Sequence, residues 1–228
     1  MAPEVLGDRT WPEVGSDVTV VVPVGSLEQH GPHLPLDTDT VIAAAVASTI
    51  PKVLVAPPVA YGSSGEHQSF SGTVSIGSDA LELLLVEYGR SVCTWAARAV
   101  FVNGHGGNAT ALAKAVQRLR FEGRDVVWVP CAVSAADAHA GRTETSLLLH
   151  LAADRVRLDR AVVGALEPIA ELLPRLRDGG VAAVSASGVL GDPTGASAEE
   201  GRELFAGLRD RVARAVEAWR PDTYGMLR

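Results

Sequence analysis

Cysteine is almost absent from this sequence. Among 228 residues only Cys93 and Cys131 are cysteines, and neither has a partner at the CxxC spacing of redox and zinc-binding motifs. We therefore expect reduced thiols and a cytoplasmic protein rather than a disulfide-stabilised secreted one. Residues 1–11 also lack the basic and apolar regions of a secretory signal, which favours the same location.

Basic residues and long apolar runs are scarce as well. The 20 lysines and arginines are outnumbered by 27 aspartates and glutamates, which gives a formal net charge of -7. A nucleic-acid partner is not expected, because phosphate binding requires a concentrated basic surface. No uncharged apolar run reaches membrane-spanning length, so no membrane partner is expected either.

The sequence does have ample material for a hydrophobic core. Hydrophobic residues make up 47% of the chain, and at this length we expect one domain over residues 1–228. Predicted strands lie at residues 18–22, 53–55, 99–102 and 126–129. Predicted helices lie at residues 38–50, 81–98, 110–120 (capped by Asn108), 143–152, 158–176 and 201–219. This alternation predicts an α/β protein, a three-layer α/β/α sandwich with a mostly parallel central sheet.

The most informative segment is the loop at residues 23–40, between the first predicted strand and the first predicted helix. It contains Glu28, His30 and Asp39, a mixture of oxygen and nitrogen donors that suits divalent metals. Glu28 and His30 should point the same way, because side chains alternate along an extended segment. Asp39 could reach the same pocket, and a carboxylate that bridges two cations would hold them roughly 3.5–4 Å apart.

Two further segments place polar side chains where parallel sheets bind ligands, beyond the carboxyl ends of strands. His105 follows the third predicted strand, and the glycines after it leave room for a substrate. His139 and Glu144 flank a glycine turn before a predicted helix. Glu144 could complete the metal shell or merely favour the helix start, and His139 could exchange a proton with the substrate.

Other polar residues of these loops receive weaker assignments. We interpret His33 and Asp37 as turn formers or supporting residues. Glu66 and His67 are expected to line the pocket or hold a lid rather than bind metal. No GxSxG motif is present, which disfavours a serine hydrolase, and the glycine-rich loop at residues 103–108 lacks the Lys-Ser/Thr ending of a nucleotide-binding P-loop.

Four blocks of this sequence resemble the creatininase family of metal-dependent amidohydrolases. They are GSxExHGxHLPxxTD at residues 25–39, GEH through GT at 65–73, NGHGGN at 103–108 and HAGxxETS at 139–146. The resemblance implies an α/β sandwich with a two-metal site and commonly a hexameric homo-oligomer. Carried over by position, the metal ligands would be Glu28, His30, Asp39 (bridging), His105 and Glu144. The resemblance also implies that His139 assists proton transfer.

The chain departs from true creatininases at one position of these blocks. Gly107 stands where those enzymes have a glutamate, and their aromatic substrate-gripping residues are not evident, so creatinine is not the expected substrate. The segments at residues 60–67 and 188–196 look most like the mycofactocin branch of the family. That likeness implies a peptidase that releases a modified C-terminal Val-Tyr pair from a ribosomal precursor peptide during redox-cofactor biosynthesis.

Two alternatives to this peptidase remain open. The chain could be another amidohydrolase of the family, acting on a small cyclic amide or a formamide. It could also be a non-catalytic member that binds a peptide or assembles other enzymes, although a scaffold would need none of the predicted ligands. The hypothesis for an enzyme is attack on an amide by metal-activated water, with His139 and Glu144 as catalytic residues. Two divalent ions per subunit are expected, and the donors suit zinc, iron(II) or manganese.

Overall fold

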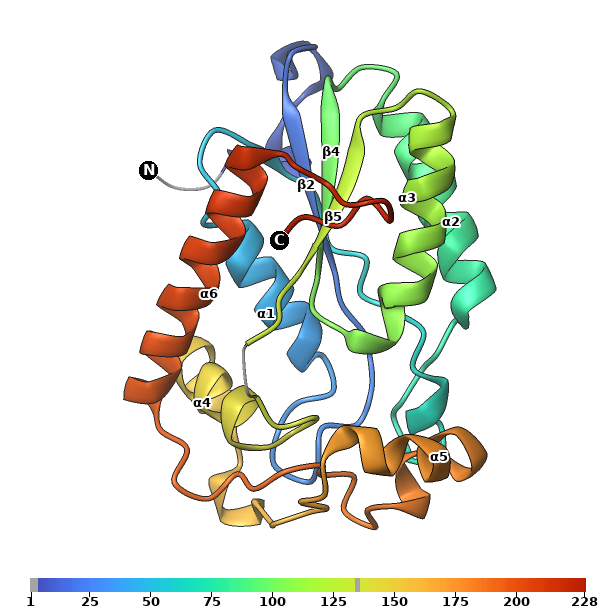
Figure 1. Cartoon of the computed structure of the whole chain (residues 1–228). Coiled ribbons are helices and arrows are strands. Elements are labelled where there is room, and N and C mark those ends of the chain that lie inside the picture. The colour runs from blue at the N-terminus through green and yellow to red at the C-terminus, as the bar shows by residue number, and fades with distance from the viewer. Residues whose placement is uncertain (1–3, 134–135) are drawn as a thin grey trace.

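A computed structural model describes residues 4–133 and 136–228 of the chain (Figure 1). Residues 1–3, part of the segment searched for a secretory signal, lie outside the described residues. The described part contains a five-stranded parallel sheet of order β1-β3-β2-β4-β5. The strands are β1 (Glu4–Val5), β2 (Thr19–Val24), β3 (Leu54–Val55), β4 (Arg98–Asn103) and β5 (Val126–Pro130).

Helices cover both faces of this sheet, which confirms the predicted α/β/α sandwich (Figure 1). One face carries α1 (Thr38–Ala47), α4 (Arg142–Leu151) and α6 (Ala198–Ala218), and the other carries α2 (Ser78–Val92) and α3 (Ala109–Phe121). Side chains alternate along β2, so Val21 packs toward the first group and Val20 and Val22 toward the second. All six residues of β2 are buried, as expected of a strand covered on both sides.

The predicted helix at residues 158–176 is wrong. The structure has a 3-10 turn at Leu158–Arg160 and then an irregular segment, and α5 begins only at Ile169 and ends at Gly179. Backbone N–H groups of Gly164 and Ala165 donate to the carbonyls of Gly191 and Val189, so this segment pairs with a distant one instead of coiling. Pro168 then disfavours helical backbone at the residue before it, which delays the helix start.

Two smaller predictions also need correction. The predicted helix at residues 81–98 starts earlier, at Ser78, and ends at Val92, because Arg98 already belongs to β4. Asn108 does not cap α3 with its side chain. Its amide instead donates to the carbonyl of Gly25 and its oxygen accepts from the N–H of Ser63, so it joins two loops of the site.

The carboxyl ends of β2 and β4 meet at the same edge of the sheet, as parallel strands require. The loops that follow them, together with α5 and the start of α4, form the lower part of the molecule in Figure 1. Within the described residues no helix is both long and apolar enough to cross a membrane.

Candidate metal centre

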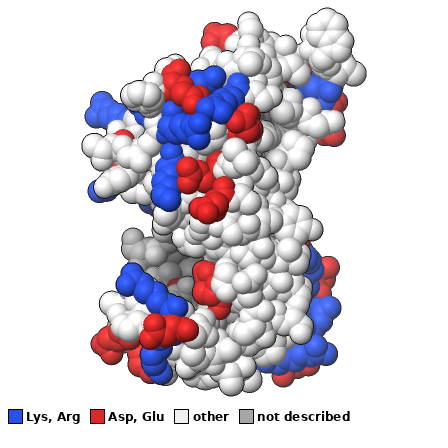
Figure 2. All heavy atoms as spheres, turned by 90° about the vertical axis from the view of Figure 1, so that its right-hand side faces the viewer, with Lys and Arg blue, Asp and Glu red and all other residues white. Residues whose placement is uncertain are grey.

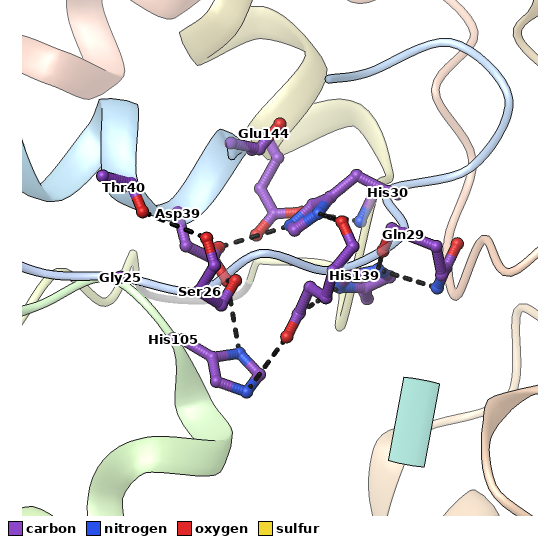
Figure 3. Close-up of polar contacts among 12 residues, drawn as sticks. Gly25, Ser26, Gln29, His30, Asp39, Thr40, His105, His139 and Glu144 are labelled. Carbon is purple, nitrogen blue, oxygen red and sulfur yellow. Dashed lines mark hydrogen bonds and ion pairs between the residues drawn. The ribbon is translucent and has the colours of Figure 1, made fainter. Parts of the chain in front are cut away.

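The loop after β2 is held against the start of α1. A side chain at Gly25 would have its Cβ only 2.2 Å from the Thr40 hydroxyl oxygen, so only glycine allows this approach. The Thr40 hydroxyl donates to the carbonyl of Ser26, and the Ser26 hydroxyl donates to Asp39 over 2.7 Å (Figure 3). These contacts fix the Asp39 carboxylate at the sheet edge.

Asp39 lies between two histidines that come from different loops (Figure 3). Its Oδ1 is 3.3 Å from Nε2 of His30, and its Oδ2 is 3.2 Å from Nδ1 of His105. The other ring nitrogen of His105 is 3.2 Å from Oε2 of Glu28. Each Asp39 oxygen thus faces a different histidine, which is the arrangement required of a carboxylate that bridges two cations.

Glu144 approaches this cluster from the first turn of α4. Its Oε2 accepts a 2.6 Å hydrogen bond from the N–H of Ala140 and lies 3.9 Å from Nε2 of His30. Three overlapping groups have ligand atoms within 4.8 Å of one another: Glu28 with Asp39 and His105, His30 with His139 and Glu144, and Glu28 with His67 and His139. The structure therefore brings together all the residues that the sequence suggested as ligands.

The electrostatics of the cluster favour a bound cation. Glu28 is completely buried, and neither carboxylate oxygen has a hydrogen-bond partner among the described residues. Burial raises the pKa of Glu28 and of Glu144 to about 7. A buried carboxylate without partners is costly unless a cation compensates it, so the donors present fit divalent metal ions.

The pKa values of the other titratable groups of the cluster are also set by burial and by neighbouring charges. Burial would lower the histidine pKa values, but nearby carboxylates outweigh it and raise the pKa of His30 to about 10 and that of His105 to about 9. Burial would raise the pKa of Asp39, yet the two histidines hold it well below its ordinary value. Burial and the neighbouring histidines lower the pKa of His67 to about 3 and that of His139 well below its ordinary value.

His33 and Asp37 lie outside the cluster. Nε2 of His33 is 2.9 Å from the Thr145 hydroxyl oxygen, so this buried ring joins the loop to α4. Asp37 forms a 2.6 Å ion pair with Arg155. Both residues therefore connect the loop to neighbouring segments, as expected of supporting residues.

His67 is the site residue that sequence reasoning underestimated. It belongs to a 3-10 turn, η3 (Gly65–His67), and its Nε2 lies 3.4 Å from Oε1 of Glu28. Glu66 and His67 both line the cavity, but the proximity of His67 to Glu28 was not predicted. The GEH block drew attention to this residue, but only the fold brings its ring to a loop 38 residues away.

Gly107 is constrained by the same cluster. A Cβ at this position would lie 2.4 Å from Nε2 of His105 and 2.4 Å from the carbonyl oxygen of Ser63. The packing therefore leaves no room at position 107 for the glutamate expected of creatininases. Glu144 still supplies a carboxylate to the cluster from α4.

The cluster faces a cavity of 730 Å³. Polar groups of one wall include Asp39, His105, His139 and Glu144. The facing wall is mainly apolar, with Ile169, Leu173 and Leu176 from α5, Val181 from the following turn, and Leu190. The cavity opens to solvent, since Ile169 and Leu173 of its wall are 46% and 40% exposed. Figure 2 shows the surface hollowed between the upper and lower parts of the molecule.

Comparison with known proteins identifies what this arrangement resembles. The family model for creatininase, described as creatinine amidohydrolase, matches residues 7–216. A mycofactocin precursor peptide peptidase of Mycolicibacterium smegmatis (strain ATCC 700084 / mc(2)155) is 60% identical, with 99% of this chain and 95% of that protein covered.

Solved creatininase structures share the fold. A mutant creatininase of Zn-Zn type has a TM-score of 0.79 and 27% identity, with 96% of this chain and 98% of that chain covered. A structure described as creatininase Mn has a TM-score of 0.79 and 27% identity, with 96% and 100% covered. These similarities extend over nearly the whole of each chain.

Proposed function

Because the chain belongs to the creatininase family, we propose that it is a metal-dependent peptidase that cleaves a mycofactocin precursor peptide and releases its modified C-terminal Val-Tyr pair. The observation that carries this proposal is the buried, unpartnered Glu28 carboxylate beside Asp39 and His105, at the wall of a cavity. Similarity over nearly the full length to a mycofactocin precursor peptide peptidase supports the choice of substrate.

We infer that two divalent ions would bind here. Glu28, Asp39 and His105 would hold one, and His30, Asp39 and Glu144 the other, with Asp39 shared. Zinc, iron(II) and manganese all suit these donors, and two similar structures are described by zinc or manganese. When bound, such ions would polarise the scissile amide and lower the pKa of water toward neutrality.

Two residues of the chain would handle protons. His139 is buried and lines the cavity beside the cluster, so its ring could accept a proton from water and pass it to the leaving amine. Glu144, the second predicted catalytic residue, lines the same cavity; its pKa of about 7 belongs to the metal-free site, and a bound cation would lower it. The Ala140 N–H fixes the Glu144 carboxylate in place.

The apolar lining of the cavity favours a peptide end over a small cyclic amide. The cavity volume of 730 Å³ lies within the range of roughly 300–1,000 Å³ typical of ligand sites and would admit either. The apolar side chains of Ile169, Leu173 and Leu176 would contact an apolar or aromatic group, such as the modified Val-Tyr pair. A small polar ring would leave this wall without a partner.

The experiment is mass spectrometry of the modified precursor peptide after incubation with metal-loaded protein, with chelator-treated protein and Glu28→Gln as controls. We expect metal-dependent appearance of the modified Val-Tyr product and its loss in both controls. No cleavage by protein that demonstrably holds its metals would refute the peptide substrate. Small cyclic amides and formamides would then be tested on the same preparation.

A further inference from the structure

Gln29 lies between Glu28 and His30 and is buried, although its neutral amide is not a metal ligand. Its Nε2 is 2.8 Å from Nδ1 of His67 and 3.1 Å from Nε2 of His139. One side chain therefore touches the two histidines of the cavity that the metal assignment above does not use. Figure 3 shows Gln29 beside His139.

Two backbone groups determine which way the Gln29 amide points. The N–H of Gly31 donates to Oε1 over 2.9 Å, and Nε2 donates to the carbonyl of Gly188 over 3.1 Å. Reversing the amide would place its oxygen against the carbonyl oxygen of Gly188 and its N–H group against the N–H of Gly31. Gly188 has φ +80°, and a Cβ there would lie 1.9 Å from Oε1, so the backbone is shaped around this amide.

The amide orientation fixes the hydrogen of His67. Because Nε2 of Gln29 is a donor, Nδ1 of His67 must accept and carries no hydrogen. The ring hydrogen then resides on Nε2, which faces Oε1 of Glu28 at 3.4 Å. A ring nitrogen with a hydrogen cannot bind a metal, so His67 presents an N–H to the cluster.

The backbone carbonyl of Gln29 fixes the hydrogen of His139. Its Nε2 is 2.7 Å from the backbone carbonyl of Gln29, which can only accept, so Nε2 carries the hydrogen. The two amide hydrogens of Gln29 then go to His67 and Gly188, and the 3.1 Å contact of its Nε2 with Nε2 of His139 is not a hydrogen bond. In the neutral ring Nδ1 has a free lone pair, and it lies 3.8 Å from Oε1 of Glu28.

We propose that Gln29 is a positioning residue for both histidines: its side-chain amide makes His67 present a hydrogen-bond donor to the cavity, and its backbone carbonyl makes His139 present an acceptor. The acceptor would take a proton during peptide cleavage, while the His67 donor would orient Glu28 or the substrate carbonyl. Only this catalytic consequence rests on the proposed function; the hydrogen positions do not.

The first test is NMR of the full chain with 15N-labelled histidine, in metal-free and zinc-loaded form, using long-range proton–nitrogen correlations. Signals are assigned with His67→Asn and His139→Asn, each of which removes one ring. We expect Nδ1 without hydrogen and Nε2 with hydrogen in both residues. A hydrogen on Nδ1 of His67, zinc on its Nε2, or averaging between the two tautomers would overturn the proposal.

The second test replaces the donor by an acceptor of the same shape. Gln29→Glu should move the His67 hydrogen to Nδ1 and lower kcat by about 10–100-fold, the usual effect of losing a supporting partner, with KM and bound zinc unchanged. Gln29→Met removes the donor without adding charge and should leave His67 as a mixture of tautomers. Gln68→Glu, the same change at an exposed neighbour of His67, is the matched control and should alter neither signals nor kcat.

These readouts separate the proposal from its premise. An unchanged hydrogen position in both Gln29 variants would overturn the positioning role, even if stability or activity fell. Expected hydrogen positions with no cleavage of the precursor peptide by the wild-type protein would instead contradict the proposed function and leave the positioning role standing.

Discussion

The buried carboxylate of Glu28 is central to the chemistry of this site. Its carboxylate faces His67, His105 and His139 from the centre of the cluster. No hydrogen bond from the described residues satisfies it, so without a metal only protonated histidines such as His105 compensate its charge. The site at the scale of single residues is therefore built to receive a cation.

Glu28→Gln should remove the need for a compensating cation at this site. The amide keeps the shape of the side chain but loses the charge, so we expect metal content to fall and peptide cleavage to disappear. Metal analysis by mass spectrometry on purified protein measures the first effect. The half-buried Glu82, on α2 and outside the cluster, offers Glu82→Gln as a control that should retain full metal content. Full metal content in Glu28→Gln would contradict its assignment as a ligand.

His139→Asn should separate proton transfer from metal binding. The residue is not among the five assigned ligands, so bound metal should remain unchanged. If its ring accepts the proton, kcat should fall by about 10²–10⁴-fold. Steady-state kinetics together with metal analysis provide the measurement, and an unchanged kcat would exclude the role in proton transfer.

Metal binding should release protons. In the metal-free protein the pKa values of His30 and His105 are raised to about 10 and 9, so both rings hold an extra proton at pH 7.5. A ligand imidazole must be neutral, and the cation therefore competes with protons below those pKa values and ceases to compete above them. Affinity for zinc should rise with pH up to about 9–10.

Titration calorimetry at pH 7.5, in buffers with different ionisation enthalpies, measures these released protons. His150→Asn is the control, because His150 is exposed on α4 and outside the cluster. It should leave proton release unchanged, whereas His105→Asn should reduce it. Binding without proton release would show that the imidazoles are already neutral.

At the scale of elements, the loops after β2 and β4 are shaped by the absence of side chains. Gly25 contacts the start of α1, and Gly107 contacts His105 and Ser63. The neighbouring Gly106 differs, because an added Cβ there would meet nothing within 4 Å. This contrast between adjacent glycines provides a test of how tightly the loop is packed.

Gly107→Ala should destabilise the protein by about 1–3 kcal/mol, the usual cost of overpacking, and should weaken metal binding by moving His105. Gly106→Ala should change neither quantity. Urea unfolding of the metal-free proteins and metal analysis of the purified ones give the two measurements. Equal behaviour of the two variants would show that the loop at Gly107 can relax.

The helix α5 forms the apolar wall of the cavity. Leu173→Ala removes part of a surface that would contact the released end of the peptide, so KM should rise up to about tenfold, with kcat little changed. The control is Leu83→Ala, since Leu83 is an exposed leucine of α2 that does not line this cavity. An unchanged KM for Leu173→Ala would place the substrate elsewhere.

At the scale of the whole molecule, the sandwich places ligands from distant parts of the chain at one edge of its sheet. Loops after β2 and β4 and the start of α4 converge there because parallel strands end on the same side. Assembly of several copies and a cytoplasmic location stay predictions. Analytical ultracentrifugation should show a mass several times the 23.8 kDa of one chain, and a monomer would exclude the predicted homo-oligomer.

The sequence by itself determined the alternation of strands and helices, the sandwich and the residues proposed as ligands. Hydrophobic periodicity is a local property, and the motif at residues 25–39 places three of those residues within a dozen positions of one another. The prediction failed at residues 158–176, where an apolar helical pattern was overridden by backbone pairing of Gly164 and Ala165 with residues 189–191.

Only the tertiary structure decided the contacts between segments far apart in the chain. Gln29 meets His67 at a separation of 38 residues and His139 at 110, and no local pattern encodes either contact. The apolar wall from α5 and the lack of room at Gly107 likewise follow from packing. Local sequence specifies which groups are available, whereas burial and close packing specify which of them meet and in what protonation state.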